Sequence, residues 1–150
     1  MFRNILCAVD LNVESTSTVT KAVQIAHQFN SKIVLLYVLE EFMNRDEMKM
    51  LRVNIETVKS DFAKTAIMAK NEMKGIMHKL HAEDIDVKFL LKEGQSNKII
   101  CEEAEKNQSD LIIVGNSSNN SLVNFLFSSK TNYIIKHVNI PVLLVPIKSV

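Results

Sequence analysis

Serine and asparagine side chains gather in residues 111–130, which read LIIVGNSSNNSLVNFLFSSK. An apolar run ends at Gly115, a polar run follows, and an apolar segment then leads to Ser128 and Ser129. A strand, a polar loop and a helix in this order can cradle a phosphate, because backbone N–H groups at a helix N-terminus donate hydrogen bonds to anions. Such cradles normally carry several glycines, and this stretch has only Gly115. It predicts either an altered phosphate site or a solvated turn capped by serine.

Groups for covalent or metal chemistry do not form a recognisable pattern. The sequence contains no Gly-x-Ser-x-Gly nucleophile elbow. His78 and His81 could share a helix face, but two imidazoles without a third ligand make a weak metal site. Cys7 and Cys101 lie in separate apolar segments without CxxC spacing, which predicts two buried free thiols. We therefore expect no catalytic residue and no metal site.

Composition and length limit the protein class. The chain has 150 residues, of which 47% are hydrophobic and 23% charged, with a formal net charge of +1. This length predicts one domain, residues 1–150, with its own core. A charge near zero gives no attraction for nucleic acid or an anionic membrane. The apolar residues 5–9 are too few for a secretion signal, and no run is long enough to span a bilayer. We expect a cytoplasmic protein without nucleic-acid or membrane partners.

The elements that must position the polar residues can be predicted from periodicity. Short apolar runs predict strands, and apolar residues at steps of three and four predict the helices between them. The strands are expected near residues 5–9, 33–39, 87–91, 111–114 and 142–145, and the helices within residues 19–29, 48–80, 99–104 and 123–138. Strands that alternate with helices imply an open, doubly wound parallel sheet with helices on both faces. Ligands bind such sheets beyond the carboxyl ends of the strands, here at Asp10, residues 38–41 and the segment after Gly115.

Four stretches of the chain form a recognisable series: ILCAVD, KIVLLYVLE, KEGQSNKIICEEAEKNQSDLIIVG and IIKHVNIPVLLVP. In their order and spacing, along the whole chain, they resemble the universal stress protein family. The family usually shows Gly-x-Pro-x-x-x-Ile before its third helix. Here the motif reads Gly94, Ser96 and Ile99 or Ile100, so the proline is absent. The resemblance implies a five-stranded α/β fold with strand order 3-2-1-4-5.

The resemblance also allows the polar loop to be compared with the glycine motif of nucleotide-binding family members. Nucleotide-binding members carry Gly-x-x-Gly, nine residues, and then Gly followed by Ser or Thr. Gly115 fills the first place, Ser118 and Ser128 replace the other two glycines, and Ser129 keeps the hydroxyl. The segment FSSKTNYIIKHVNIPVLLVP is similar to a family branch that does not bind ATP. No cofactor is therefore expected, although ATP or AMP with magnesium is a possible ligand.

If a nucleotide binds, the resemblance implies a position for each contact. The implied adenine and ribose contacts are Ala8, Val9, Asp10 and Val38. The implied sugar and phosphate contacts are Gly115, Ser117, Ser118, Ser128, Ser129 and Lys130. Local structure offers other roles, because Asp10 could cap the following helix and Val38 could be ordinary core.

The last strand predicts a partner surface. Residues 141–146 read PVLLVP, and an apolar strand at the edge of a sheet tends to pair with another chain. The resemblance implies a homodimer in which two copies of this strand pair antiparallel, centred on Val142, Leu143, Leu144 and Val145. The function expected from it is a stress-response regulatory or protective module that acts by partner binding, with weak or absent ATP binding. The alternative is an ATP- or AMP-binding switch of the same fold with slow ATP hydrolysis.

Overall fold

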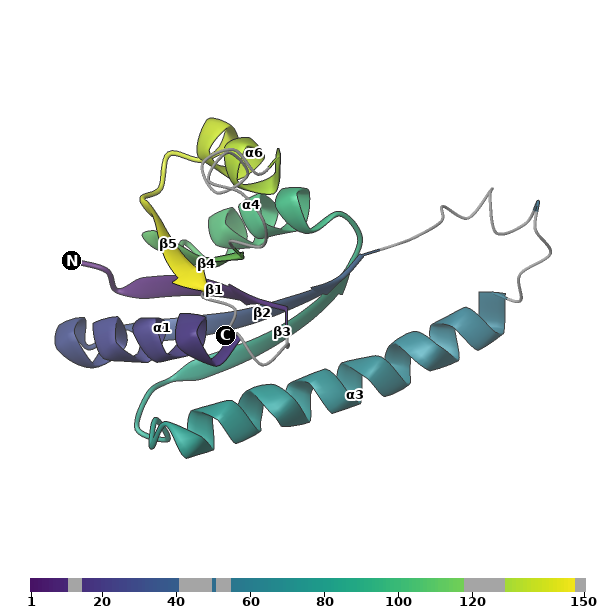
Figure 1. The fold of residues 1–150 in the computed structure, drawn as a ribbon, viewed down its shortest axis with the longest axis horizontal. Helices are drawn as coiled ribbons and strands as arrows, with labels where there is room; N and C mark the ends of the chain where they lie inside the picture. Colours follow the sequence, from purple (N-terminus) through teal and green to yellow (C-terminus); the bar gives the residue numbers. More distant parts are fainter. Residues whose placement is uncertain (11–14, 41–49, 51–54, 118–128, 148–150) are drawn as a thin grey trace.

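Strands and helices alternate along the chain in this computed structural model, which describes residues 1–10, 15–40, 50, 55–117 and 129–147 (Figure 1). The elements are β1 (Asn4–Val9), α1 (Ser15–Phe29), β2 (Lys32–Leu39), α3 (Ile55–Lys79), β3 (Val87–Glu93), α4 (Ser96–Lys106), β4 (Leu111–Ser117), α6 (Ser129–His137) and β5 (Val142–Ile147). Asn30 has a positive φ of 54° directly after α1 and ends that helix, a conformation that asparagine tolerates well. The alternation of elements matches the pattern predicted from periodicity.

The five strands form one parallel sheet in the order β3-β2-β1-β4-β5, as the family resemblance implied. β1 is central, with Ile5 opposite Ile33 of β2 on one side and Leu111 of β4 on the other. Strands covered on both faces read as continuous apolar runs, which is why residues 5–9 and 111–114 could be recognised in the sequence.

Helices cover both faces of the sheet, so the predicted doubly wound arrangement is confirmed (Figure 1). Because side chains alternate along a strand, Ile5 and Cys7 enter the core under α1 and α3, whereas Leu6 enters the core under α4 and α6. Met73 of α3 contributes to the first core and Ile134 of α6 to the second. Of the two predicted buried thiols, Cys7 is fully buried, which raises its pKa to about 12, whereas Cys101 is only half-buried.

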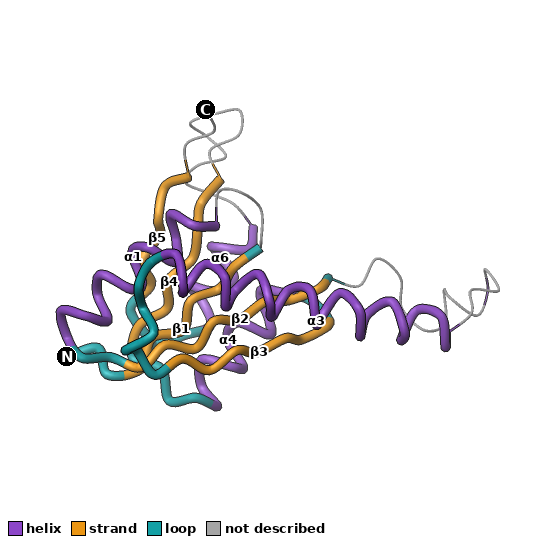
Figure 2. The backbone as a smooth tube through the Cα atoms, turned by 90° about the horizontal axis from the view of Figure 1, so that it is seen from below, coloured by secondary structure: helices purple, strands orange, loops and turns teal. Residues whose placement is uncertain are grey.

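The helix α3 is long, and only its second half packs on the sheet. Ala69, Met73 and Met77 are buried at steps of four, whereas Ile67 and Met68 are 65% and 64% exposed. Figures 1 and 2 show the first turns of α3 projecting beyond the ends of β2 and β3. Among the residues placed by the structure, no helix is long and apolar enough to cross a lipid bilayer.

The sequence left open whether His78 and His81 share a helix face, and in the structure they do not. The helix α3 ends at Lys79, and His81 has a positive φ of 51° in the turn that follows. His78 instead places its Nδ1 atom 2.7 Å from Oε1 of Glu83. The left-handed residue ends the helical repeat, so side-chain spacing along the sequence no longer describes positions in space.

The strand β4 is longer than predicted. Its apolar run stops at Val114, but the strand continues to Ser117, with Gly115 opposite Val145 and Asn116 opposite Pro146 of β5. Gly115 therefore lies inside a strand and does not start the loop. Proline is compatible with β5 because this strand lies at the edge of the sheet.

Candidate functional site

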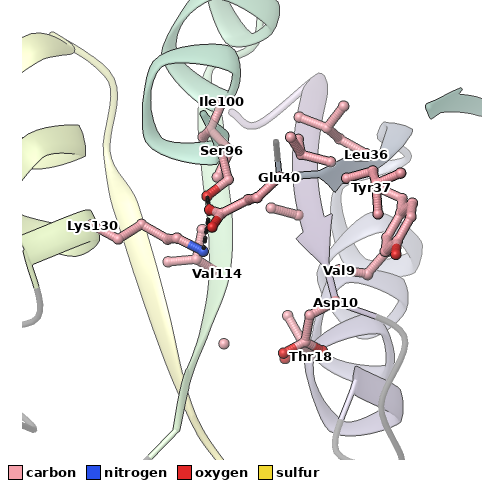
Figure 3. Close-up of a pocket in the computed structure, with 14 residues that line it drawn as sticks. Val9, Asp10, Thr18, Leu36, Tyr37, Glu40, Ser96, Ile100, Val114 and Lys130 are labelled. Atoms are coloured by element: carbon pink, nitrogen blue, oxygen red, sulfur yellow. Dashed lines mark hydrogen bonds and ion pairs between the residues drawn. The ribbon is translucent and has the colours of Figure 1, made fainter. Parts of the chain in front are cut away.

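A cavity of about 260 Å³ opens where β1, β2 and β4 end (Figure 3). Its volume is close to the lower end of the range typical of small-molecule sites, which begins near 300 Å³. The strands supply apolar walls and the neighbouring helices supply polar groups. The lining residues are Ala8, Val9, Asp10, Thr18, Leu36, Tyr37, Val38, Leu39, Glu40, Ser96, Ile100, Val114, Gly115 and Lys130. The cavity lies at the carboxyl edge of the sheet, between β1 and β4, where successive connections leave toward opposite faces.

Three polar side chains from different elements meet at one side of this cavity (Figure 3). The hydroxyl of Ser96 donates a hydrogen bond to Oε1 of Glu40. The ammonium of Lys130 lies 3.7 Å from the same oxygen. Ser96 is buried, whereas the side chains of Glu40 and Lys130 are 57% and 53% exposed. The contact therefore joins the end of β2 to the first residues of α4 and α6.

The position of Glu40 is explained by the start of α4. The first N–H groups of a helix have no partner within the helix, and the N-cap residue Gln95 makes no side-chain capping bond. A carboxylate is favoured there because the N-terminus of a helix carries a partial positive charge. The hydrogen bond from the Ser96 hydroxyl lowers the pKa of Glu40 most. Partial desolvation raises this pKa, whereas the charge of Lys130 and the backbone N–H of Ser96 lower it further. Glu40 is therefore ionised at neutral pH.

Gly94 sets the direction in which the chain enters α4. Its φ is +138°, a value that residues with a β-carbon rarely adopt. Its N–H donates to the carbonyl oxygen of Leu39 at 3.0 Å, and an added Cβ would lie 2.9 Å from Cδ1 of Ile99. Ile99 thus lies against Gly94, whereas Ile100, which stands at the motif's own spacing from Gly94, is buried and lines the cavity. The glycine lets β3 end against β2 while Ser96 turns toward Glu40.

The structure brings together six of the ten residues that the resemblance assigned to a nucleotide. Lining the cavity are Ala8, Val9, Asp10, Val38, Gly115 and Lys130. Ser117 ends β4 and Ser129 begins α6. Ser118 and Ser128, which stand in place of the family's glycines, lie outside the described residues.

Leu39 and Glu40 also line the cavity, and they fall within residues 38–41, which the sequence indicated as part of the ligand edge. Sequence reasoning missed the remaining lining residues, which are Thr18, Leu36, Tyr37, Ser96, Ile100 and Val114. A signal existed for Ser96, which stands where the family motif has proline and supplies the hydroxyl that binds Glu40.

The cavity lining carries more acidic than basic side chains and one buried hydroxyl without a partner among the described residues. Among the lining residues, Asp10 and Glu40 carry carboxylates and Lys130 carries the ammonium. Thr18 is 2% exposed, and its hydroxyl has no hydrogen-bond partner among the residues that the structure describes. Within those same ranges, no three His, Cys, Asp or Glu side chains come together in a way that could hold a metal ion. The arrangement suits a ligand with an apolar body, a hydrogen-bonding edge and little negative charge.

Comparison with known proteins gives the same picture of the fold. The chain is 28% identical over 159 aligned positions to universal stress protein MJ0577 of Methanocaldococcus jannaschii, covering 99% of this chain and 98% of that protein. The solved structure of MJ0577 superposes with a TM-score of 0.76 at 26% identity, covering 100% of this chain and 99% of the other.

Two more distant structures share the fold. The universal stress protein UspA from Lactobacillus plantarum has a TM-score of 0.74 at 23% identity, covering 96% of this chain and 97% of that chain. A universal stress protein from Archaeoglobus fulgidus in complex with dAMP has a TM-score of 0.60 at 16% identity, covering 99% and 98%. The sequence model of the universal stress protein family matches residues 1–146. The chain therefore belongs to the universal stress protein family.

Proposed function

We propose that this chain is a cytoplasmic stress-response regulatory module, a single domain that acts as a homodimer through contacts with partner proteins. Its cavity holds an adenine compound, and ATP binds there weakly or not at all. The observation that carries this proposal is the contact between Glu40 and Lys130, in which the ammonium that lines the cavity is already paired with a carboxylate of the same chain.

The walls of the cavity support an adenine compound as the ligand. Leu36, Val38 and Val114 present apolar surface on which a flat base can lie, and Asp10 can accept a hydrogen bond from a sugar hydroxyl. The A. fulgidus protein of the same fold was solved in complex with dAMP, which supports an adenine nucleotide as a ligand class.

Two features argue that ATP binds weakly. The first is the pairing of Lys130 with Glu40, since a phosphate must compete with that carboxylate for the ammonium. The second is the replacement of two family glycines by Ser118 and Ser128 in the sequence, because a β-carbon hinders close approach of phosphate to the backbone.

The edge strand β5 supports the homodimer. Among the strands that the structure describes, its one neighbour is β4, so its other side presents backbone groups that can pair with a second copy. Val142, Leu143 and Leu144 are half-buried, and Val145 is buried within this chain. An antiparallel pair of β5 strands would cover this apolar edge in both copies.

A second candidate is an ATP- or AMP-binding switch of the same fold. The dAMP bound to the A. fulgidus relative favours it, because the fold itself is compatible with a nucleotide as the principal ligand. In this alternative, a nucleotide bound in the cavity changes which partner proteins the dimer can bind, and the protein then hydrolyses ATP slowly.

Isothermal titration with adenosine, AMP and ATP, with and without magnesium, separates the two candidates. The regulatory module predicts weak binding, with ATP no tighter than adenosine. Low-micromolar or tighter ATP binding that is lost in Asp10→Ala would support the switch instead. Changing Ser118 and Ser128 to glycine should raise ATP affinity if the missing glycines limit it. Sedimentation equilibrium checks the dimer, and a monomer at micromolar concentration would contradict it.

A further inference from the structure

We propose that Glu40 is a specificity-determining residue that makes the cavity select uncharged adenine nucleosides over their phosphorylated forms. This inference rests on the proposed function, in which the cavity holds an adenine compound. It assigns to Glu40 a role that none of the residues carried over from the family motif provides.

The carboxylate of Glu40 lies against the two groups beside the cavity that would attract a phosphate. Two features near the cavity attract anions: the N-terminus of α4 at Ser96 and the ammonium of Lys130 in the first turn of α6. Oε1 of Glu40 accepts a hydrogen bond from the Ser96 hydroxyl and lies 3.7 Å from Nζ of Lys130. One carboxylate oxygen thus contacts both anion-attracting groups at once. A phosphate that approaches either group meets a negative charge already in place.

The net negative charge of the lining side chains adds to this repulsion of phosphate. Asp10 and Glu40 together outnumber Lys130, so these side chains carry a formal net charge of −1. A neutral nucleoside avoids repulsion from this lining, whereas each phosphate charge adds to it.

Exposure to solvent limits the size of the discrimination. Because Glu40 and Lys130 are each more than half exposed, water and salt screen their interaction with a ligand. Removing the charge of Glu40 should therefore raise the affinity for ATP by about tenfold at low ionic strength, and the affinity for adenosine by about twofold at most.

Glu40 also lies at the N-terminus of α4, so its charge must be tested separately from its structural contact. Glu40→Gln keeps an oxygen that can accept the Ser96 hydroxyl bond and removes only the charge. Glu105→Gln is the matched control, because Glu105 is exposed near the other end of α4 and the variant has the same net charge. Circular dichroism establishes that both variants are folded.

The experiment is isothermal titration of the unmodified chain, Glu40→Gln and Glu105→Gln with adenosine, AMP and ATP. We expect a gain that grows with phosphate number in Glu40→Gln alone and shrinks at high ionic strength. If adenosine binds but the ratio of ATP to adenosine affinity is the same in all three proteins, the role of Glu40 is refuted and the proposed function stands. An equal gain in Glu105→Gln also refutes it, since net charge would then be the cause.

Two measurements need no variant. In the unmodified chain, ATP affinity should not fall as salt concentration rises, because screening weakens repulsion from a negative lining. A steep fall would indicate a positive site and would overturn the inference. If neither the unmodified chain nor Glu40→Gln binds adenosine, AMP or ATP, the proposed adenine ligand is wrong and the inference fails with it.

Discussion

Replacing Gly94 by alanine should destabilise the protein by about 3 kcal/mol, and two structural terms give this value. The backbone φ of +138° lies in a region that is nearly exclusive to glycine, where strain costs about 1–3 kcal/mol. The new Cβ would also lie 2.9 Å from Cδ1 of Ile99, so the end of that side chain must shift, at a cost of about 0.5–1.5 kcal/mol. For a chain of this length, the sum lowers the melting temperature by about 6–12 °C.

Urea unfolding followed by circular dichroism measures this change at one fixed protein concentration, since dimerisation would make stability depend on concentration. Gly75→Ala is the matched control, because Gly75 lies in α3 and nothing lies within 4 Å of an added Cβ. Alanine is the better helix former, so Gly75→Ala should stabilise the protein by about 1 kcal/mol. The same substitution thus has opposite effects at the two positions.

The variant Ile99→Val separates the two terms at Gly94. Valine lacks the Cδ1 atom that the new Cβ would meet, so Gly94→Ala should cost about 1 kcal/mol less in the Ile99→Val background. A Gly94→Ala protein within about 0.5 kcal/mol of the unmodified chain would refute the reasoning, because that is the usual effect of a surface substitution. Equal costs in the two backgrounds would refute the contact with Ile99 and leave the backbone strain.

Three further predictions concern other parts of the molecule. Thr18→Val should stabilise the protein by about 1 kcal/mol in urea unfolding, because it removes a buried hydroxyl without a partner among the described residues; a loss would reveal such a partner. His27 lowers the pKa of Asp84 below its ordinary 3.8, so the contribution of Asp84 to stability is complete above pH 3.8 and declines as pH falls further; Asp84→Asn should flatten that part of a pH series of urea unfolding curves. Leu143→Lys on β5 should shift sedimentation toward monomer, whereas Ile135→Lys on the exposed face of α6 should not.

Periodicity in the sequence predicted the sheet because burial on both faces leaves a continuous apolar run. It failed at the end of β4, where Asn116 and Ser117 are polar and still pair with β5. Pairing of that kind depends on a strand about 30 residues further along the chain. The same limit applies to His81, since a single left-handed residue after α3 changes the direction of the chain.

The candidate site could be predicted only in part. Asp10 and Val38 were expected at the edge of the sheet because Asp10 follows the first strand and Val38 lies near the end of the second, and the structure places both at the cavity. The contact between Glu40 and Ser96 joins residues 56 positions apart, and neither residue alone indicates it. The departure from the family's proline at Ser96 was the visible sign that this corner of the molecule differs.

The half-packed helix α3 has a consequence for local opening of the chain. Its full burial begins at Ala69, and Phe62, Thr65 and Ala66 before it are only half-buried. The first turns therefore depend more on local helix propensity, which holds short helices only marginally in water. Backbone amides in residues 56–66 should therefore exchange hydrogen for deuterium much faster than those in residues 70–79, without unfolding of the sheet. A protease that cuts in these first turns would interrupt the helix and leave intact the cavity at the carboxyl edge of the sheet, which α3 does not line.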